Sequence, residues 1–141
     1  MATKIFLDTN IILDLLDNQR QYHKDAVVLF ELIDNGEVMP FFSESVVATT
    51  DYILQKLLSK TLRVEFFGEI ARKIQILPCS NLILDRALSL EFEDLEDAIL
   101  FQLASENKVD FFITNDKKLL NSTLKGMQLV QAGQFLNMKS A

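Results

Sequence analysis

Short strand-like runs alternate with segments of helical period along the sequence, and this alternation constrains the fold more than any other feature. The strand-like runs are mostly apolar and lie at residues 4–7, 38–42, 75–77, 109–114 and 127–130. Segments whose apolar residues recur at helical spacing fill the intervals between these runs. Because neighbouring parallel strands need long crossover connections, we expect an α/β fold with a central parallel sheet between helices, in a three-layer α/β/α arrangement.

Turn and capping residues mark the ends of several expected elements. Asn35-Gly36 ends one helical segment, Ser43 is a suitable N-cap for the next, and Pro78 closes the third strand. The run at residues 109–114 is β-prone and nearly all apolar, so we expect a central strand buried on both faces. The expected helices cover residues 10–16, about 26–33, 44–74 with a break near 59–61, two segments between 81 and 107 joined at 90–93, a short segment from 117 and a final turn at 131–136.

Composition restricts the chemistry that this chain can perform. Its 141 residues are 49% hydrophobic, which suits one globular domain over residues 1–141. A formal net charge of −6 argues against a broad electrostatic grip on nucleic acid, so any chemistry on nucleic acid must be local. Because the chain has one cysteine and one histidine, an internal disulfide and a His-rich zinc site are excluded. We find no export signal and no apolar run near the roughly 20 residues of a membrane helix, so we expect a cytoplasmic protein without membrane association.

Carboxylates stand where the expected strands end. Asp8 directly follows the first strand, and Asp116 lies two residues beyond the fourth. Asp94 and Asp97 open the helix that leads into that fourth strand, and their spacing of three places them on one helix face. Because the site of a parallel α/β protein lies at the carboxyl ends of its strands, we expect these four acids to share one rim.

Crowded carboxylates repel one another unless a cation or a shared proton compensates. Oxygen ligands without histidine or cysteine favour Mg²⁺ or Mn²⁺ over zinc, and such ions support phosphodiester hydrolysis by activating water. Each acid also has a purely structural alternative, since Asp8 and Asp116 suit helix caps and Asp94 and Asp97 suit the positive end of a helix dipole. Capping alone gives no reason for all four to fall on a single sheet edge.

Three segments resemble the PIN domain, a family of metal-dependent ribonucleases that includes the VapC toxins of bacterial toxin–antitoxin pairs. They are IFLDTNIILDLL near the N-terminus, LEDAILFQLA in the third quarter and DFFITNDKKL around residue 116. The resemblance spans essentially the whole chain in order and spacing. It implies that Asp8, Asp97 and Asp116 are the catalytic acids and metal ligands, with Asp94 as an additional acidic ligand.

Other residues near these acids are candidates for substrate binding. Asn10 is the small polar residue that accompanies the first acid in the family pattern, and Thr114 and Asn115 precede the last acid in its T-x-D arrangement. Lys117 and Lys118 follow directly and are placed to meet a phosphate, although a surface role is about as well supported, and Lys117 is the candidate for substrate binding.

The sequence departs from the family pattern at position 49. Many members carry a glutamate there, on the helix after the second strand, whereas this chain has Thr49. Glu44 and Asp51 flank this position, but their helical spacing makes neither an obvious substitute. The expected site therefore has Asp8, Asp97 and Asp116 and binds metal more weakly than a set of four acids.

The resemblance implies a Mg²⁺- or Mn²⁺-dependent endoribonuclease that cleaves single-stranded RNA. If it extends to the toxins, a small antitoxin would restrain the activity and the protein would form a homodimer. Thr49 supports an alternative, a weakened PIN-fold module that binds RNA or a protein partner without hydrolysis. An aspartyl-phosphate enzyme based on Asp8 is less well supported, because Asn10 stands where such phosphatases need a second aspartate.

Overall fold

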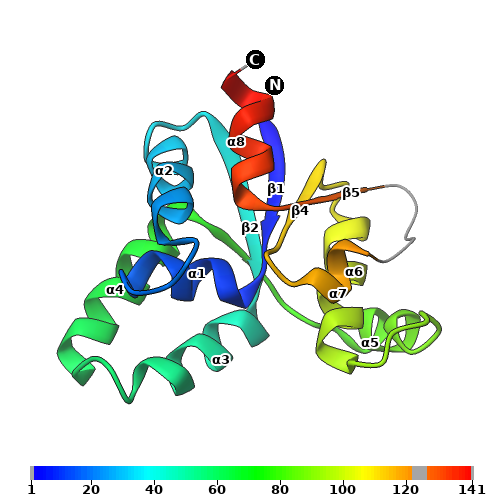
Figure 1. Ribbon diagram of the computed structural model, residues 1–141. Helices are drawn as coiled ribbons and strands as arrows, with labels where there is room; N and C mark the ends of the chain where they lie inside the picture. Colours follow the sequence, from blue (N-terminus) through cyan, green and yellow to red (C-terminus); the bar gives the residue numbers. More distant parts are fainter. Residues whose placement is uncertain (1, 122–126, 141) are drawn as a thin grey trace.

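The computed structural model describes residues 2–121 and 127–140, and its centre is one parallel sheet (Figure 1). The strands are β1 (Thr3–Leu7), β2 (Val38–Ser43), β3 (Gln75–Leu77), β4 (Phe111–Ile113) and β5 (Gln128–Val130). They form a five-stranded sheet in the order β3-β2-β1-β4-β5, with every neighbouring pair parallel. The expected α/β fold is therefore confirmed.

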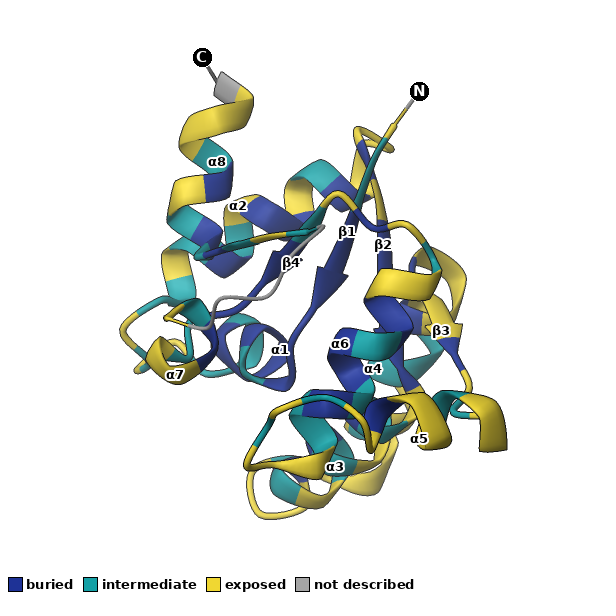
Figure 2. Cartoon of the chain, turned by 90° about the vertical axis from the view of Figure 1, so that its right-hand side faces the viewer, coloured by how far each residue is buried: buried dark blue, intermediate teal, exposed yellow. Residues whose placement is uncertain are grey.

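Helices cover both faces of this sheet. They are α1 (Thr9–Leu16), α2 (His23–Asp34), α3 (Glu44–Leu54), α4 (Lys60–Lys73), α5 (Asn81–Ala87), α6 (Leu95–Glu106), α7 (Lys117–Leu120) and α8 (Ala132–Ser140). Figure 1 shows α1, α2 and α8 on one side of the sheet and α6 with α5 on the other. The two layers bury β1 and β2 over most of their length (Figure 2).

The core explains why β1 lies at the centre of the sheet. Ile5, Phe6 and Leu7 are fully buried, as a strand with a helix layer on each face requires. Phe6 pairs in register with Phe112 of β4, and the two rings stack with their centroids 5.2 Å apart. The fourth strand is thus an interior strand, as expected, although β1 occupies the middle position.

Several boundaries differ from those expected from the sequence, most clearly at the α3–α4 break, at β4 and at α8. The long helical segment is interrupted at residues 55–59, earlier than the predicted break at 59–61, because the Ser59 side chain accepts a hydrogen bond from the Leu62 N–H and caps α4. The fourth strand is shorter than the apolar run that predicts it, and α8 extends beyond the predicted final turn. Across residues 2–121 and 127–140, no helix combines the length and apolar character needed to cross a membrane.

The pairing of β1 with β4 brings distant parts of the sequence together. Leu7 is in register with Ile113, and the Asp8 N–H donates to the Ile113 carbonyl at 3.1 Å. The residues that follow these two strands therefore start side by side at the carboxyl edge of the sheet. This edge holds all four acids singled out above.

Candidate active site

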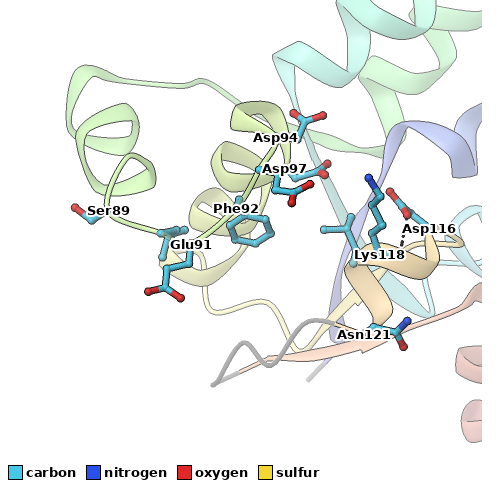
Figure 3. Close-up of a pocket in the computed structure, with 11 residues that line it drawn as sticks. Ser89, Glu91, Phe92, Asp94, Asp97, Asp116, Lys118 and Asn121 are labelled. Atoms are coloured by element: carbon cyan, nitrogen blue, oxygen red, sulfur yellow. Dashed lines mark hydrogen bonds between the residues drawn. The ribbon is translucent and has the colours of Figure 1, made fainter.

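A pocket of about 960 Å³ opens at the carboxyl edge of the sheet. Its walls come from the segment before α6, from the first turn of α6 and from α7. Figure 3 shows Asp97 on α6 and Asp116 before α7 on opposite sides of this pocket, with both side chains directed into the space between. Asp94 lies beside Asp97 on the α6 side.

Asp8 follows β1 at the same edge of the sheet, is buried and is firmly held. It is the N-cap of α1, and its Oδ1 accepts a hydrogen bond of 2.7 Å from the Thr9 N–H. Its Oδ2 accepts one of 2.8 Å from the hydroxyl of Thr114, which lies 106 residues away. Burial raises the pKa of Asp8, while the hydrogen bonds from Thr114 and Thr9 oppose that shift. Both carboxylate oxygens therefore have fixed positions.

Thr114 joins Asp8 to Asp116. Its hydroxyl donates to Asp8 and accepts a hydrogen bond of 3.0 Å from the Asp116 N–H. Asp116 is the N-cap of α7, where its Oδ1 accepts from the Lys118 N–H at 2.9 Å. Thr114 has no exposed surface, so in this structure it positions the two acids.

The acids of α6 are much less constrained. Asp94 caps the helix through a hydrogen bond of 2.8 Å from the Glu96 N–H to its Oδ1. Partial burial and then the negative charges of Asp94, Asp8, Asp116 and Glu96 raise the pKa of Asp97 to about 7. The four predicted acids are therefore close enough to form one electrostatic cluster.

Asn10 and Asn115 are held by an ion pair between Asp14 and Arg20 that the sequence did not reveal. Asp14 is almost fully buried, and its Oδ1 forms an ion pair of 2.7 Å with Nε of Arg20. Its Oδ2 accepts a hydrogen bond of 2.9 Å from the Asn115 side chain, while Arg20 donates to Asn10 at 3.4 Å. The signal available was the spacing of Asp14, which follows Asn10 by four residues in an otherwise apolar helix.

Of the two adjacent lysines, Lys118 is the one found among the residues lining the pocket. Lys117, which the sequence favours for substrate binding, is exposed on α7. The substrate-binding roles of Lys117, Asn10, Thr114 and Asn115 stay predictions.

Position 49 faces an acid that sequence reasoning also missed. The Thr49 hydroxyl on α3 donates a long hydrogen bond of 3.5 Å to Oε2 of Glu96 on α6. Burial, followed by the charges of Asp94 and Asp8, raises the pKa of Glu96. The flanking acids are engaged elsewhere, since Glu44 accepts from the Cys79 N–H and Asp51 pairs with Arg63.

The residues of this cluster match a hard divalent cation in chemistry and charge. All candidate ligands are oxygens, and a cation would relieve both the burial of charge and the repulsion by other acids that raise the pKa of Asp97. Within the described ranges, however, no group of three or more acidic, histidine or cysteine side chains is already arranged to hold a metal ion.

Fold and site together define a parallel α/β protein with an acidic pocket at the carboxyl edge of its sheet. The model of a family described as "PIN domain" matches residues 4–118, and the chain belongs to this family. The resemblance carried by the three sequence segments is thereby confirmed.

Known relatives agree with this assignment. Ribonuclease VapC1 of Aquifex aeolicus is 25% identical to the chain over 129 residues, which are 88% of this chain and 89% of that protein. A toxin–antitoxin complex from Klebsiella pneumoniae contains a similar fold, with a TM-score of 0.67, 19% identity and coverage of 91% of this chain and 97% of that one. VapBC2 from Rickettsia felis, crystallised with a DNA fragment from its promoter, gives a TM-score of 0.64, 16% identity and coverage of 89% and 96%.

Proposed function

We propose that this protein is a metal-dependent endoribonuclease that hydrolyses phosphodiester bonds in single-stranded RNA. The observation that carries the proposal is that Asp97 and Asp116 line one pocket and that Asp8, from a third distant segment, acts on Asp97 with its charge. The similarity to Ribonuclease VapC1 supports RNA as the substrate.

Asp8, Asp97 and Asp116 would hold Mg²⁺ or Mn²⁺, with Asp94 contributing from the α6 N-terminus. A bound divalent cation supplies positive charge that activates water and stabilises the leaving oxygen of the phosphodiester. Thr114 keeps Asp8 and Asp116 in a fixed relation through its two hydrogen bonds. Keeping these two acids in place limits the reorganisation that the site must undergo when substrate arrives.

Cationic and amide side chains around the acids suit an RNA backbone. Lys118 lines the pocket beside Asp116, and the preceding lysine is exposed on the same short helix. Asn10 accepts a hydrogen bond from Arg20, and Asn115 donates one to Asp14. Lysines would contact phosphate oxygens, and the asparagines would hold the first helix and the last acid in register.

Replacing single acids tests the mechanism. With Mn²⁺ and a single-stranded RNA, the purified protein should release shorter fragments, and Asp8→Asn or Asp116→Asn should reduce cleavage to background, because each removes a negative oxygen from the cluster. Asp85→Asn, an exposed change of the same charge on α5, should leave cleavage unchanged. Circular dichroism checks that the variants keep the fold. Full activity in both site variants would eliminate this mechanism.

Thr49 favours a second candidate, a PIN-fold module that binds RNA or a protein partner without hydrolysis. Position 49 on α3 carries an acid in the family pattern but a threonine hydroxyl here, so the negative charge of that acid is missing. Calorimetry with Mg²⁺, Mn²⁺ and Ca²⁺ separates the candidates, since the absence of both ion binding and cleavage would favour the module.

We also propose that the protein is the toxin of a toxin–antitoxin pair and forms a homodimer. The likeness to a chain from a toxin–antitoxin complex supports the first part, with a small antitoxin covering the acidic pocket. The homodimer is supported by apolar side chains that are exposed on α3, on α4 and in the turn between them. They are Tyr52, Leu57, Leu62 and Val64. Light scattering tests the dimer, and inhibition by a small protein encoded beside this chain tests the pair.

A further inference from the structure

We infer that Phe92 forms a subsite for an unpaired nucleobase beside the acids of the pocket. A base of the RNA would stack on the Phe92 ring while a neighbouring phosphate reaches the acidic cluster. The inference rests on the proposed function and deepens it, because it names the part of a single-stranded RNA that the protein binds without using charge.

The position of the ring is the first observation. Phe92 lies in the segment between α5 and α6 and lines the same pocket as Asp97 and Asp116. Figure 3 shows its ring on the α6 side, directed toward the space between this wall and α7. Among the described residues that line the pocket, Phe92 is the only aromatic one. A flat apolar surface therefore lies beside the proposed reacting centre.

Burial separates Phe92 from the phenylalanines of the core. Phe6 and Phe112 are fully buried and stack on each other, whereas Phe92 is only partly buried. Its ring packs against buried Phe101 of α6, with the centroids 5.8 Å apart, and its N–H donates to the Leu90 carbonyl at 3.1 Å. The core thus supports the ring, while part of its surface stays accessible in the pocket.

The charge of the pocket explains why an uncharged contact matters for RNA. Lys118 is the one basic residue among the described residues of the lining. The lining also contains five acids, which are Glu91, Glu93, Asp94, Asp97 and Asp116. Acidic charge would exceed basic charge here even with a divalent cation bound, so attraction to RNA phosphates is weak. Stacking of a base on an aromatic ring supplies affinity that does not depend on charge.

The rest of the lining suits a single nucleotide with an unpaired base. Leu90 and Leu119 add apolar surface, and Asn121 adds an amide that can hydrogen-bond to a base edge. The volume of about 960 Å³ lies within the range of roughly 300–1,000 Å³ typical of ligand sites. In a duplex the bases are already stacked and paired, so this subsite favours single strands and accepts every base to some extent.

Fluorescence anisotropy of the full chain in EDTA measures this binding without metal-dependent cleavage. The probes are a labelled single-stranded RNA of mixed sequence and an oligomer of the same length whose residues lack bases. Phe92→Leu should weaken binding of the RNA by about fivefold or more, as expected when a stacking side chain is removed, and should leave binding of the baseless oligomer unchanged. Phe92→Tyr, which keeps the aromatic ring, should bind the RNA as the wild type does.

The salt dependence of binding provides a second readout that a damaged fold would not reproduce. Because stacking releases no counterions, Phe92→Leu should lower the affinity without changing the slope of its logarithm against the logarithm of salt concentration. Lys118→Met should reduce that slope, since it removes a phosphate contact. Phe67→Leu makes the same substitution at a partly buried ring of α4 that does not line the pocket, and it should change neither quantity.

Wild-type RNA affinity in Phe92→Leu would overturn the stacking subsite. An equal loss for the two oligomers would also overturn it, because the effect would then come from the fold or from backbone contacts. A wild type that cleaves RNA with Mn²⁺ but binds it no better than the baseless oligomer would overturn this inference alone. A wild type that neither binds RNA nor cleaves it would overturn the proposed function as well.

Discussion

The acidic cluster has two sides, the strand wall of Asp8 and Asp116 and the helix wall of Asp97 and Glu96, and they hold their charges in different ways. On the strand side, Asp8 and Asp116 are tied together by Thr114, and every one of these contacts is a hydrogen bond of 2.7 to 3.0 Å. On the helix side, Asp97 and Glu96 are partly exposed and are surrounded by other negative charges. The hydrogen bond from Thr49 to Glu96 is long, at 3.5 Å.

This difference separates two tasks within one site. The strand wall is already organised by the fold, because its hydrogen bonds offset the cost of burying negative charge. The helix wall carries charge that the protein itself does not compensate. The strand wall is therefore part of the folded core, and under the proposed function the helix wall is the part that a cation would stabilise.

The largest effect should come from breaking the support of the strand wall. Asp14→Ala removes the carboxylate that pairs with the partly exposed Arg20 and accepts from the Asn115 amide, so it should lower the free energy of unfolding by about 2 kcal/mol. Urea denaturation measures this change. Asp34→Ala removes an ion pair between two partly exposed side chains and should shift the midpoint far less. Equal shifts in the two variants would show that burial of Asp14 does not matter.

An opposite effect is expected on the helix wall. The pKa of Asp97 is about 7 in the folded protein and 3.8 in its ordinary state, so the folded state binds more protons between these pH values. Stability contributed by Asp97 is then present at low pH and lost as the pH rises toward 7. Asp97→Asn should therefore stabilise the EDTA-treated protein near pH 8, by about 1 kcal/mol after allowing for solvent screening, and hardly at all near pH 4.

Thermal melts of both proteins at the two pH values provide the measurement. A variant that is less stable than the wild type near pH 8 would contradict the repulsion inferred for α6. An equal gain at both pH values would show that the effect does not come from ionisation.

The smallest effect is expected from comparing two variants of Asp94, which separates its helix cap from its charge. Asparagine keeps the side-chain oxygen that accepts from the Glu96 N–H, whereas alanine does not, and both changes remove the charge. Asp94→Asn should therefore be more stable than Asp94→Ala by about 0.5–1 kcal/mol, seen as a higher urea midpoint. Identical midpoints would mean that the cap contributes nothing to α6.

Much of the fold was predictable because the signals were local. Hydrophobic period and turn residues predicted all five strands and the helices between them, and the main errors lie at element ends. The early break before α4 depends on Ser59, whose capping hydrogen bond decides between two nearby starts. The order of strands in the sheet was not predicted, because several orders satisfy the same parallel crossovers.

The candidate site was predicted in part. Asp8 follows β1 and Asp116 follows β4. Because these two strands pair in parallel, their carboxyl ends bring the two acids to the same edge of the sheet. Asp14 was missed because a polar residue in an apolar helix does not reveal its partner, and Asn115 is 101 residues away. Glu96 was missed because its contact with Thr49 depends on how α3 packs near α6, which no local pattern records.

The sequence by itself determined the kind of fold, the family and the acids that follow the strands, because periodicity, capping and strand exits are encoded over a few residues. Only the tertiary structure decided which distant groups meet: Thr114 with Asp8, Asn115 with Asp14 and Thr49 with Glu96. The physical reason is that hydrogen bonds and charge repulsion depend on distances of a few ångströms, which the packing of whole layers sets and no local pattern records.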